Sequence, residues 1–152
     1  MPGIGSVVAL LSLLCLEGSP IVQTPGSTIP IKTIEKGTQS NVEDPRMVIV
    51  RSSDEWAKLW RAHAPDRTPP SVDFSRDMIV GVFLGSRPTA GYQVEIVGAR
   101  LDDERSPHGA LVVQYRVTAP AADAVTAAVL TMPCHLVAVA ARAGDVKFEK
   151  LK

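Results

Sequence analysis

The residues of this 152-residue chain with the most direct capacity for chemistry are three histidines and two cysteines. Imidazole and thiol groups bind metal ions, and a thiol activated by an imidazole can act as a nucleophile. Cys134 and His135 are adjacent, and adjacent side chains on a strand point to opposite faces. His63 and His108 lie in other segments, so they complete no local cluster. We therefore expect no catalytic residue, no metal and no cofactor, and we interpret Cys134 as a buried free thiol.

Other motifs that carry chemistry are weak in this chain. Asp102, Asp103 and Glu104 form an acidic cluster that lacks the alternating ligand spacing of calcium loops, so we interpret it as a solvated turn. The sequence has no phosphate-binding glycine loop and no nucleophile elbow. Lys plus Arg equals Asp plus Glu at 16 each. A balanced charge gives no basic field for a phosphate backbone, so the composition disfavours a nucleic-acid partner.

The best-specified candidate surface is the turn at residues 85–92, which reads Gly-Ser-Arg-Pro-Thr-Ala-Gly-Tyr. Its glycines permit backbone conformations that other residues avoid, and its proline stiffens the middle. Arginine and tyrosine are enriched at interface hot spots. Two interpretations stay open here: a protein-binding loop, or a tight hairpin turn whose tyrosine packs in the core. The candidate interface residues are Arg87, Pro88, Thr89, Gly91 and Tyr92.

One helix and several strands must position this turn. Ser52 and Glu55 form a capping-box pattern. The residues that follow place an apolar stripe on one helical face, with His63 at its boundary, and the proline at position 65 ends the helix. Short apolar or alternating runs predict strands at residues 31–35, 46–51, 77–84, 92–96, 111–117, 136–141 and 146–149.

The order of these elements predicts an α+β fold, a mainly antiparallel β-sheet of about six or seven strands with one amphipathic helix packed on it. Polar turns predict one hairpin across residues 102–109 and a second across residues 143–145. Gly98 indicates a β-bulge. Residues 77–84 are apolar throughout, which is typical of a central strand buried on both faces.

The N-terminus indicates export. Residues 1–18 contain a short apolar run that is typical of a signal peptide, although no Lys or Arg precedes Lys32. Residues 19–30 are rich in Pro, Ser, Thr and Gly, which predicts a flexible linker. Residues 31–152 then form a single domain with no membrane span. We expect a periplasmic, cell-surface or secreted protein, and Cys15 is the residue that a lipid anchor would use.

Blocks of residues between positions 48 and 149 resemble the C-terminal domain of PrcB-type protease complex subunits. These blocks are residues 72–80 (VDFSRDMIV), 83–85 (FLG), 87–96 (RPTAGYQVEI) and 133–139 (PCHLVAV), with Glu55, Trp56, Leu59, Trp60 and His63 upstream. Family members often carry Gly-Gly-Tyr where this chain has Ala-Gly-Tyr, and an aromatic residue where Cys134 stands. The resemblance implies an exported, lipid-linked component of a bacterial protease complex that supports the protease.

A second, shorter resemblance concerns the turn alone. Residues 88–92 (PTAGY) are similar to the loop with which chagasin-type inhibitors block cysteine peptidases. We expect a non-catalytic, exported accessory or binding module whose partner is another protein, a protease or another envelope complex. The alternative is a protease inhibitor that acts through residues 85–92.

Overall fold

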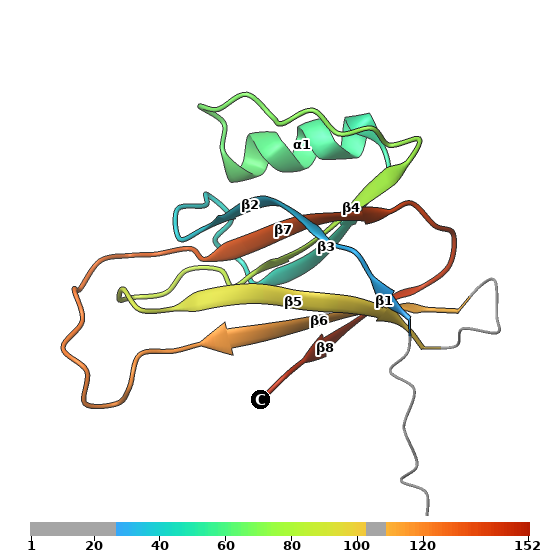
Figure 1. The fold of residues 1–152 in the computed structure, drawn as a ribbon. Helices are drawn as coiled ribbons and strands as arrows, with labels where there is room; N and C mark the ends of the chain where they lie inside the picture. Colours follow the sequence, from blue (N-terminus) through green and yellow to red (C-terminus); the bar gives the residue numbers. More distant parts are fainter. Residues whose placement is uncertain (1–26, 103–108) are drawn as a thin grey trace, which may run out of the picture.

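The computed structural model describes residues 27–102 and 109–152 (Figure 1). The predicted signal segment, Cys15 and His108 lie outside the described residues. The elements follow in the order β1 (Thr28–Ile29), β2 (Lys32–Gly37), β3 (Arg46–Val50), α1 (Ser53–His63), β4 (Asp77–Phe83), β5 (Gln93–Leu101), β6 (Leu111–Thr118), β7 (Cys134–Ala140) and β8 (Val146–Lys150). The expected mostly antiparallel β fold with one helix is confirmed.

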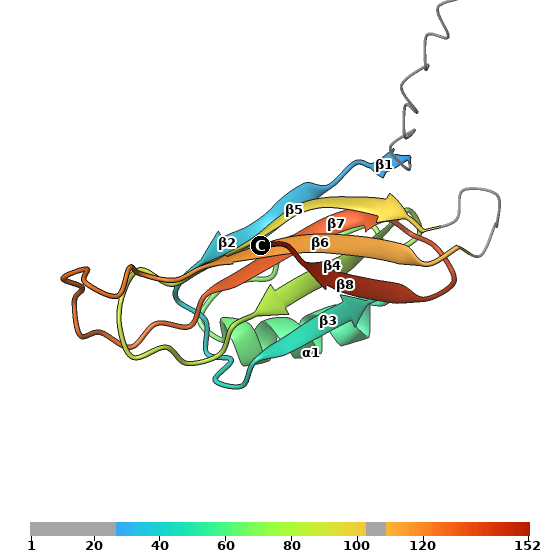
Figure 2. The same cartoon turned by 90° about the horizontal axis from the view of Figure 1, so that it is seen from below.

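The strands form two four-stranded sheets stacked face to face. One sheet has the order β1-β5-β6-β8 and the other the order β2-β7-β4-β3. The helix α1 covers the outer face of the second sheet, so in the view from below in Figure 2 it lies behind both sheets. All strand pairs are antiparallel except β6 with β8, which is parallel.

One prediction about a strand connection was wrong. The segment at residues 143–145 does not close a hairpin, because β7 and β8 belong to different sheets and the chain crosses between them there. Thr28 and Ile29, near the end of the predicted linker, pair with Arg100 and Ala99 of β5. Ile29 is half-buried against the core, which explains why this short polar stretch is held in place.

Alternating side chains of both sheets fill the space between them. In β5, Val94 and Ile96 point inward while Gln93 and Glu95 face solvent. Gly98 does mark a bulge, since the β5–β6 register shifts between Ile96 and Gly98. The β5–β6 hairpin is confirmed, as is the buried central position of β4 between β7 and β3.

The helix begins at the predicted cap, Ser52. The Ser52 hydroxyl accepts a hydrogen bond from the Glu55 amide at 3.3 Å, and the Glu55 carboxylate accepts one from the Arg51 amide at 2.8 Å. Trp56 and Trp60 are both buried against the second sheet. His63 is buried as well, with 1% of its surface exposed, so its expected position at the boundary of the core was wrong. No helix in the described residues is long and apolar enough to cross a membrane.

Candidate functional site

Two long loops lie side by side at one end of the stacked sheets. The first, residues 84–92, joins β4 to β5, and the second, residues 119–133, joins β6 to β7. Both project from the same end in Figures 1 and 2, where they appear in yellow-green and orange. Because β4 and β5 belong to different sheets, residues 85–92 form a crossover between sheets and not the hairpin turn considered from the sequence. We call this region the loop end.

Backbone hydrogen bonds fix the two loops to each other. The amide of Arg87 donates to the carbonyl of Thr131 at 2.7 Å, and the amide of Thr131 donates back to Arg87 at 2.9 Å. The Thr131 hydroxyl donates to the Thr89 carbonyl at 3.1 Å, and the Ala90 amide donates to Ala127 at 3.0 Å. The loop end is therefore a paired structure, with little of the freedom of two separate loops.

Two glycines of the first loop occupy backbone conformations that other residues rarely adopt. Gly85 has φ 71° and Gly91 has φ 96°. A Cβ atom on Gly85 would lie 2.5 Å from the Glu43 carbonyl oxygen, so the position is also closed sterically. A Cβ atom on Gly91 would lie 3.1 Å from Pro120 of the second loop. Glycine at these positions lets the chain turn and lets the two loops approach.

The predicted interface residues divide into an inner and an outer set. The guanidinium of Arg87 lies 5.5 Å from the centre of the Tyr92 ring, and both side chains are half-buried. Thr89 is half-buried too and gives its carbonyl to Thr131. Pro88 and Gly91 are exposed. Arg87 and Tyr92 thus stack on each other and stiffen the loop, while its exposed residues, Ser86, Pro88 and Gly91, are small.

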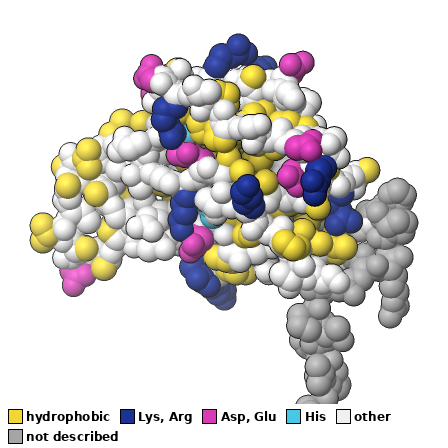
Figure 3. Space-filling model, turned by 45° about the horizontal axis from the view of Figure 1, so that its top comes forward, with side chains coloured by type: hydrophobic (Ala, Val, Ile, Leu, Met, Phe, Trp, Pro, Cys, Tyr) yellow, Lys and Arg dark blue, Asp and Glu magenta, His cyan; other side chains and the backbone are white. Residues whose placement is uncertain are grey.

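The second loop carries an exposed apolar surface that the sequence interpretation missed. Val125 is fully exposed, and Val129 and Leu130 are 46% and 56% exposed. Figure 3 shows hydrophobic side chains gathered at this end, with a single acidic group among them. Asp123 is the one charged residue between positions 119 and 131. The sequence feature that could have revealed this surface is the run from Ala127 to Leu130, which is apolar but lacks the period of a strand or a helix.

Cys134 and His135 point to opposite faces of β7, as expected. Cys134 packs under the helix, where burial raises the pKa of its thiol to about 12. The thiol is free, buried and protonated at neutral pH, which opposes a role as a nucleophile. His135 faces the other sheet, where its Nδ1 accepts a hydrogen bond from the Ile96 amide at 2.7 Å. This bond ties the two sheets together, and burial lowers the pKa of His135.

A serine, a histidine and a glutamate meet beside the C-terminus of α1. The Ser40 hydroxyl lies 2.9 Å from His63 Nδ1, and Glu35 lies 4.0 Å from His63 Nε2. Arg67 donates to the same Nε2 at 3.3 Å, so Nδ1 must carry the proton and donate it to Ser40. A histidine that donates to the serine cannot remove its proton. Ser40 is also buried, so this cluster stabilises the fold and is not arranged for catalysis.

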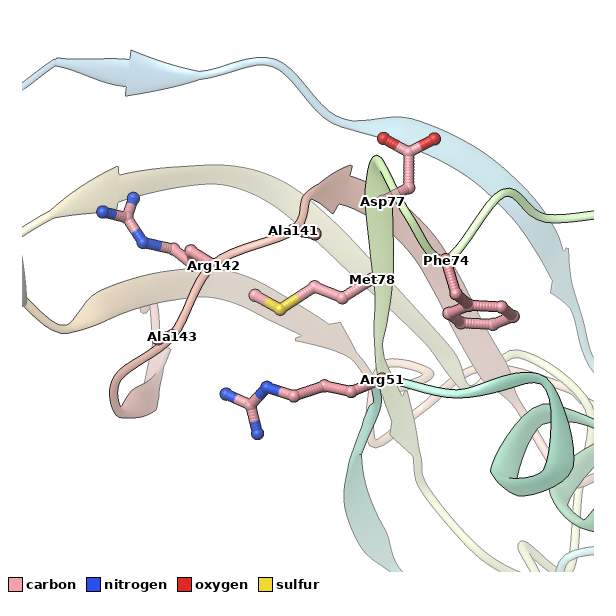
Figure 4. A pocket seen from close by; sticks show the side chains of 7 residues that line it. All are labelled: Arg51, Phe74, Asp77, Met78, Ala141, Arg142 and Ala143. Carbon is pink, nitrogen blue, oxygen red and sulfur yellow. The ribbon is translucent and has the colours of Figure 1, made fainter.

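A shallow hollow of about 400 Å³ lies where β3 ends, β4 begins and β7 leaves its sheet. In Figure 4 the guanidinium groups of Arg51 and Arg142 point to the same side, with the Met78 side chain between them, and the Asp77 carboxylate points away. Arg51 donates to the Gly144 carbonyl at 2.9 Å. The lining offers charge and apolar contact but no nucleophile. Across the described residues, no group of three or more His, Cys, Asp or Glu side chains could hold a metal ion.

The described residues thus define a mostly β domain with two stacked sheets and one helix. Residues 78–140 match the family described as PrcB C-terminal, a span that runs from β4 to β7 and contains both loops of the loop end. The match confirms the resemblance for this part of the chain. Comparisons with curated proteins and with solved structures give no significant match.

Proposed function

We propose that this domain is a non-catalytic binding module that holds another protein at its loop end. The observation that carries the proposal is the exposure of Val125, Val129 and Leu130 on a loop whose backbone is fixed. Fully burying a side chain of this kind contributes about 1.5–3 kcal/mol. Because the loops are already paired, binding would cost little additional ordering of the chain.

The chemistry of the loop end defines the partner surface. Only Asp123 carries charge between positions 119 and 131, so an apolar, complementary patch on the partner fits best. An interface of this kind depends weakly on salt, because little of its affinity comes from charge pairs. Gly85 and Gly91 serve the same surface by permitting the backbone course that brings the loops together.

The sequence supports a role and a location for this module. The resemblance to PrcB-type subunits implies a bacterial protease complex as the assembly, and the apolar N-terminal run implies export. We propose an accessory module that acts in the periplasm, on the cell surface or in the secreted fraction, and that preserves the activity of a protease or of another envelope complex. Protease inhibition is the second candidate, and the fixed pairing of two projecting loops at Arg87 and Thr131 favours it.

A comparative pull-down tests the proposal. The full chain and a variant with Val125, Val129 and Leu130 all changed to serine are used to capture envelope and secreted proteins, which are identified by mass spectrometry. We expect a partner that the wild type captures and the variant does not. A matched control is Val97→Ser, because Val97 is 39% exposed on β5 and lies outside both loops. If the captured partner is a protease, its turnover with and without the domain separates support from inhibition.

A further inference from the structure

The strand β3 ends the second sheet with an open edge. The sheet has the order β2-β7-β4-β3, and within residues 27–102 and 109–152 no strand pairs with the outer side of β3. A strand edge of this kind presents unpaired N–H and C=O groups that can pair with another extended chain. Met47 and Ile49 are large apolar residues on this strand and are 46% and 37% exposed.

A hollow lies on each face of the β3 edge. The first, which we call the sandwich-side hollow, measures about 420 Å³ and lies between β3 and the first sheet, with Met47, Val82, Tyr115 and Val117 in its lining. The second, the helix-side hollow, measures about 460 Å³ and lies between β3 and α1, with Val48 and Leu59 in its lining. Both hollows open along the same five-residue strand.

The side chains of β3 point alternately to its two faces, which explains why a hollow lies on each side of the strand. Met47 pairs with Val82, whose side chain belongs to the core between the sheets, so Met47 points to the sandwich side. Val48 packs in the cluster beneath the helix and points to the other side. A chain added beside β3 would alternate in the same way, and its successive side chains would enter the two hollows in turn.

The two hollows differ in charge. Arg46, Arg87 and Lys150 line the sandwich-side hollow, no carboxylate does, and none of the three forms an ion pair within the described part of the chain. The Nε atom of Arg87 is buried without a hydrogen-bond partner in the described residues. The helix-side hollow already holds a carboxylate, Glu55, beside Arg46 and Lys58. An acidic group is therefore favoured most on the sandwich side, where no carboxylate of the lining opposes it.

We infer that the edge of β3 is a second binding surface, which takes an extended peptide segment of a partner protein as an added strand. Its backbone pairs with β3, its apolar side chains enter both hollows, and an acidic side chain on the sandwich side meets Arg87 and Lys150. This surface lies beside the loop end and shares Leu84 and Arg87 with it. It does not depend on the function proposed for that end.

A peptide selection tests this inference. A random nonapeptide library displayed on phage is selected on the full chain, and the enriched peptides are synthesised. We expect alternating apolar sequences with an acidic residue, and protection of the amides of residues 46–50 from hydrogen exchange when the peptide binds. Ile49→Lys should lower the peptide affinity at least tenfold. Val97→Lys, the same change at a similarly exposed valine, should leave it unchanged.

Charge reversal tests the sandwich-side assignment. Lys150→Glu should lower the affinity for an acidic peptide at least threefold. It should leave unchanged the affinity for the same peptide with glutamine in place of its acidic residue. The inference is overturned if no peptide is enriched, if enriched peptides bind the Ile49→Lys variant equally, or if protection lies elsewhere. It is also overturned if sedimentation shows a dimer that Ile49→Lys dissolves, because a second copy would then occupy the edge. The loop-end triple variant should keep its peptide affinity, so the two proposals can fail separately.

Discussion

Arg87 and Thr131 exchange two backbone hydrogen bonds, although 44 positions separate them in the chain. This pair joins the loop that crosses between the sheets to the loop that carries the exposed apolar residues. The candidate surface is therefore a property of two segments together.

Gly85→Ala should destabilise the protein strongly. The left-handed backbone at φ 71° costs a residue with a side chain about 1–2 kcal/mol, and the clash of the new Cβ with the Glu43 carbonyl adds to that loss. Gly37→Ala is the matched control, because a Cβ there has no heavy atom within 4 Å. Urea denaturation should show a large decrease in the free energy of unfolding for Gly85→Ala and a small change for Gly37→Ala. Equal midpoints would mean that Gly85 is not required for the loop to turn.

Trp60→Ala should remove much of the packing that holds α1 on the second sheet. The side chain is 2% exposed, and its indole N–H donates to the Arg67 carbonyl at 2.7 Å. Truncating a buried tryptophan costs about 3–5 kcal/mol. Lys58→Ala, on the exposed face of the same helix, should change stability by less than about 0.5 kcal/mol. A melting temperature within one or two degrees of wild type for Trp60→Ala would show that the helix does not depend on this contact.

The helix and most strands could be predicted from the sequence because their signals are local. The stripe from Trp56 to His63 and the alternation around Val94 each lie within one element. The division into two sheets could not be predicted, since nothing in residues 85–92 or 141–145 shows whether the chain turns back or crosses over. The pairing of Arg87 with Thr131 could not be predicted either, because it depends on where these crossovers place the two loops. His63 was misplaced because its partner Ser40 lies 23 positions earlier in the chain.

Stability should fall as the pH drops below 6.5. Burial is the main cause that lowers the pKa of both His63 and His135 from the ordinary value of 6.5. The unfolded chain takes up protons near pH 6.5, whereas the folded protein takes them up only at lower pH. The unfolded state therefore binds more protons in that window, and the free energy of unfolding decreases.

Denaturation curves between pH 8 and pH 5 measure this dependence. His63→Asn keeps a donor that can reach Ser40 and removes one of the two titrating groups. Its free energy of unfolding should depend less steeply on pH than that of the wild type. An unchanged slope would show that His63 is not held neutral by its surroundings.

Cys134 should resist thiol reagents in the folded protein. Its pKa is raised to about 12, chiefly by burial, so almost no thiolate is present at pH 8. A Cys15→Ser variant leaves Cys134 as the single cysteine. An aromatic disulfide reagent should react with that variant at least a hundredfold faster in denaturant than in native buffer. Rapid labelling of the native protein would reopen the possibility of chemistry at Cys134.

The most direct measurement of the central claim is the affinity of a captured partner for matched variants, read by surface plasmon resonance. The loop-end variant, with Val125, Val129 and Leu130 changed to serine, should bind at least a hundredfold more weakly, with its melting temperature preserved because these side chains are exposed. Val97→Ser should bind like the wild type. Equal affinity of the wild type and the loop-end variant would contradict the account.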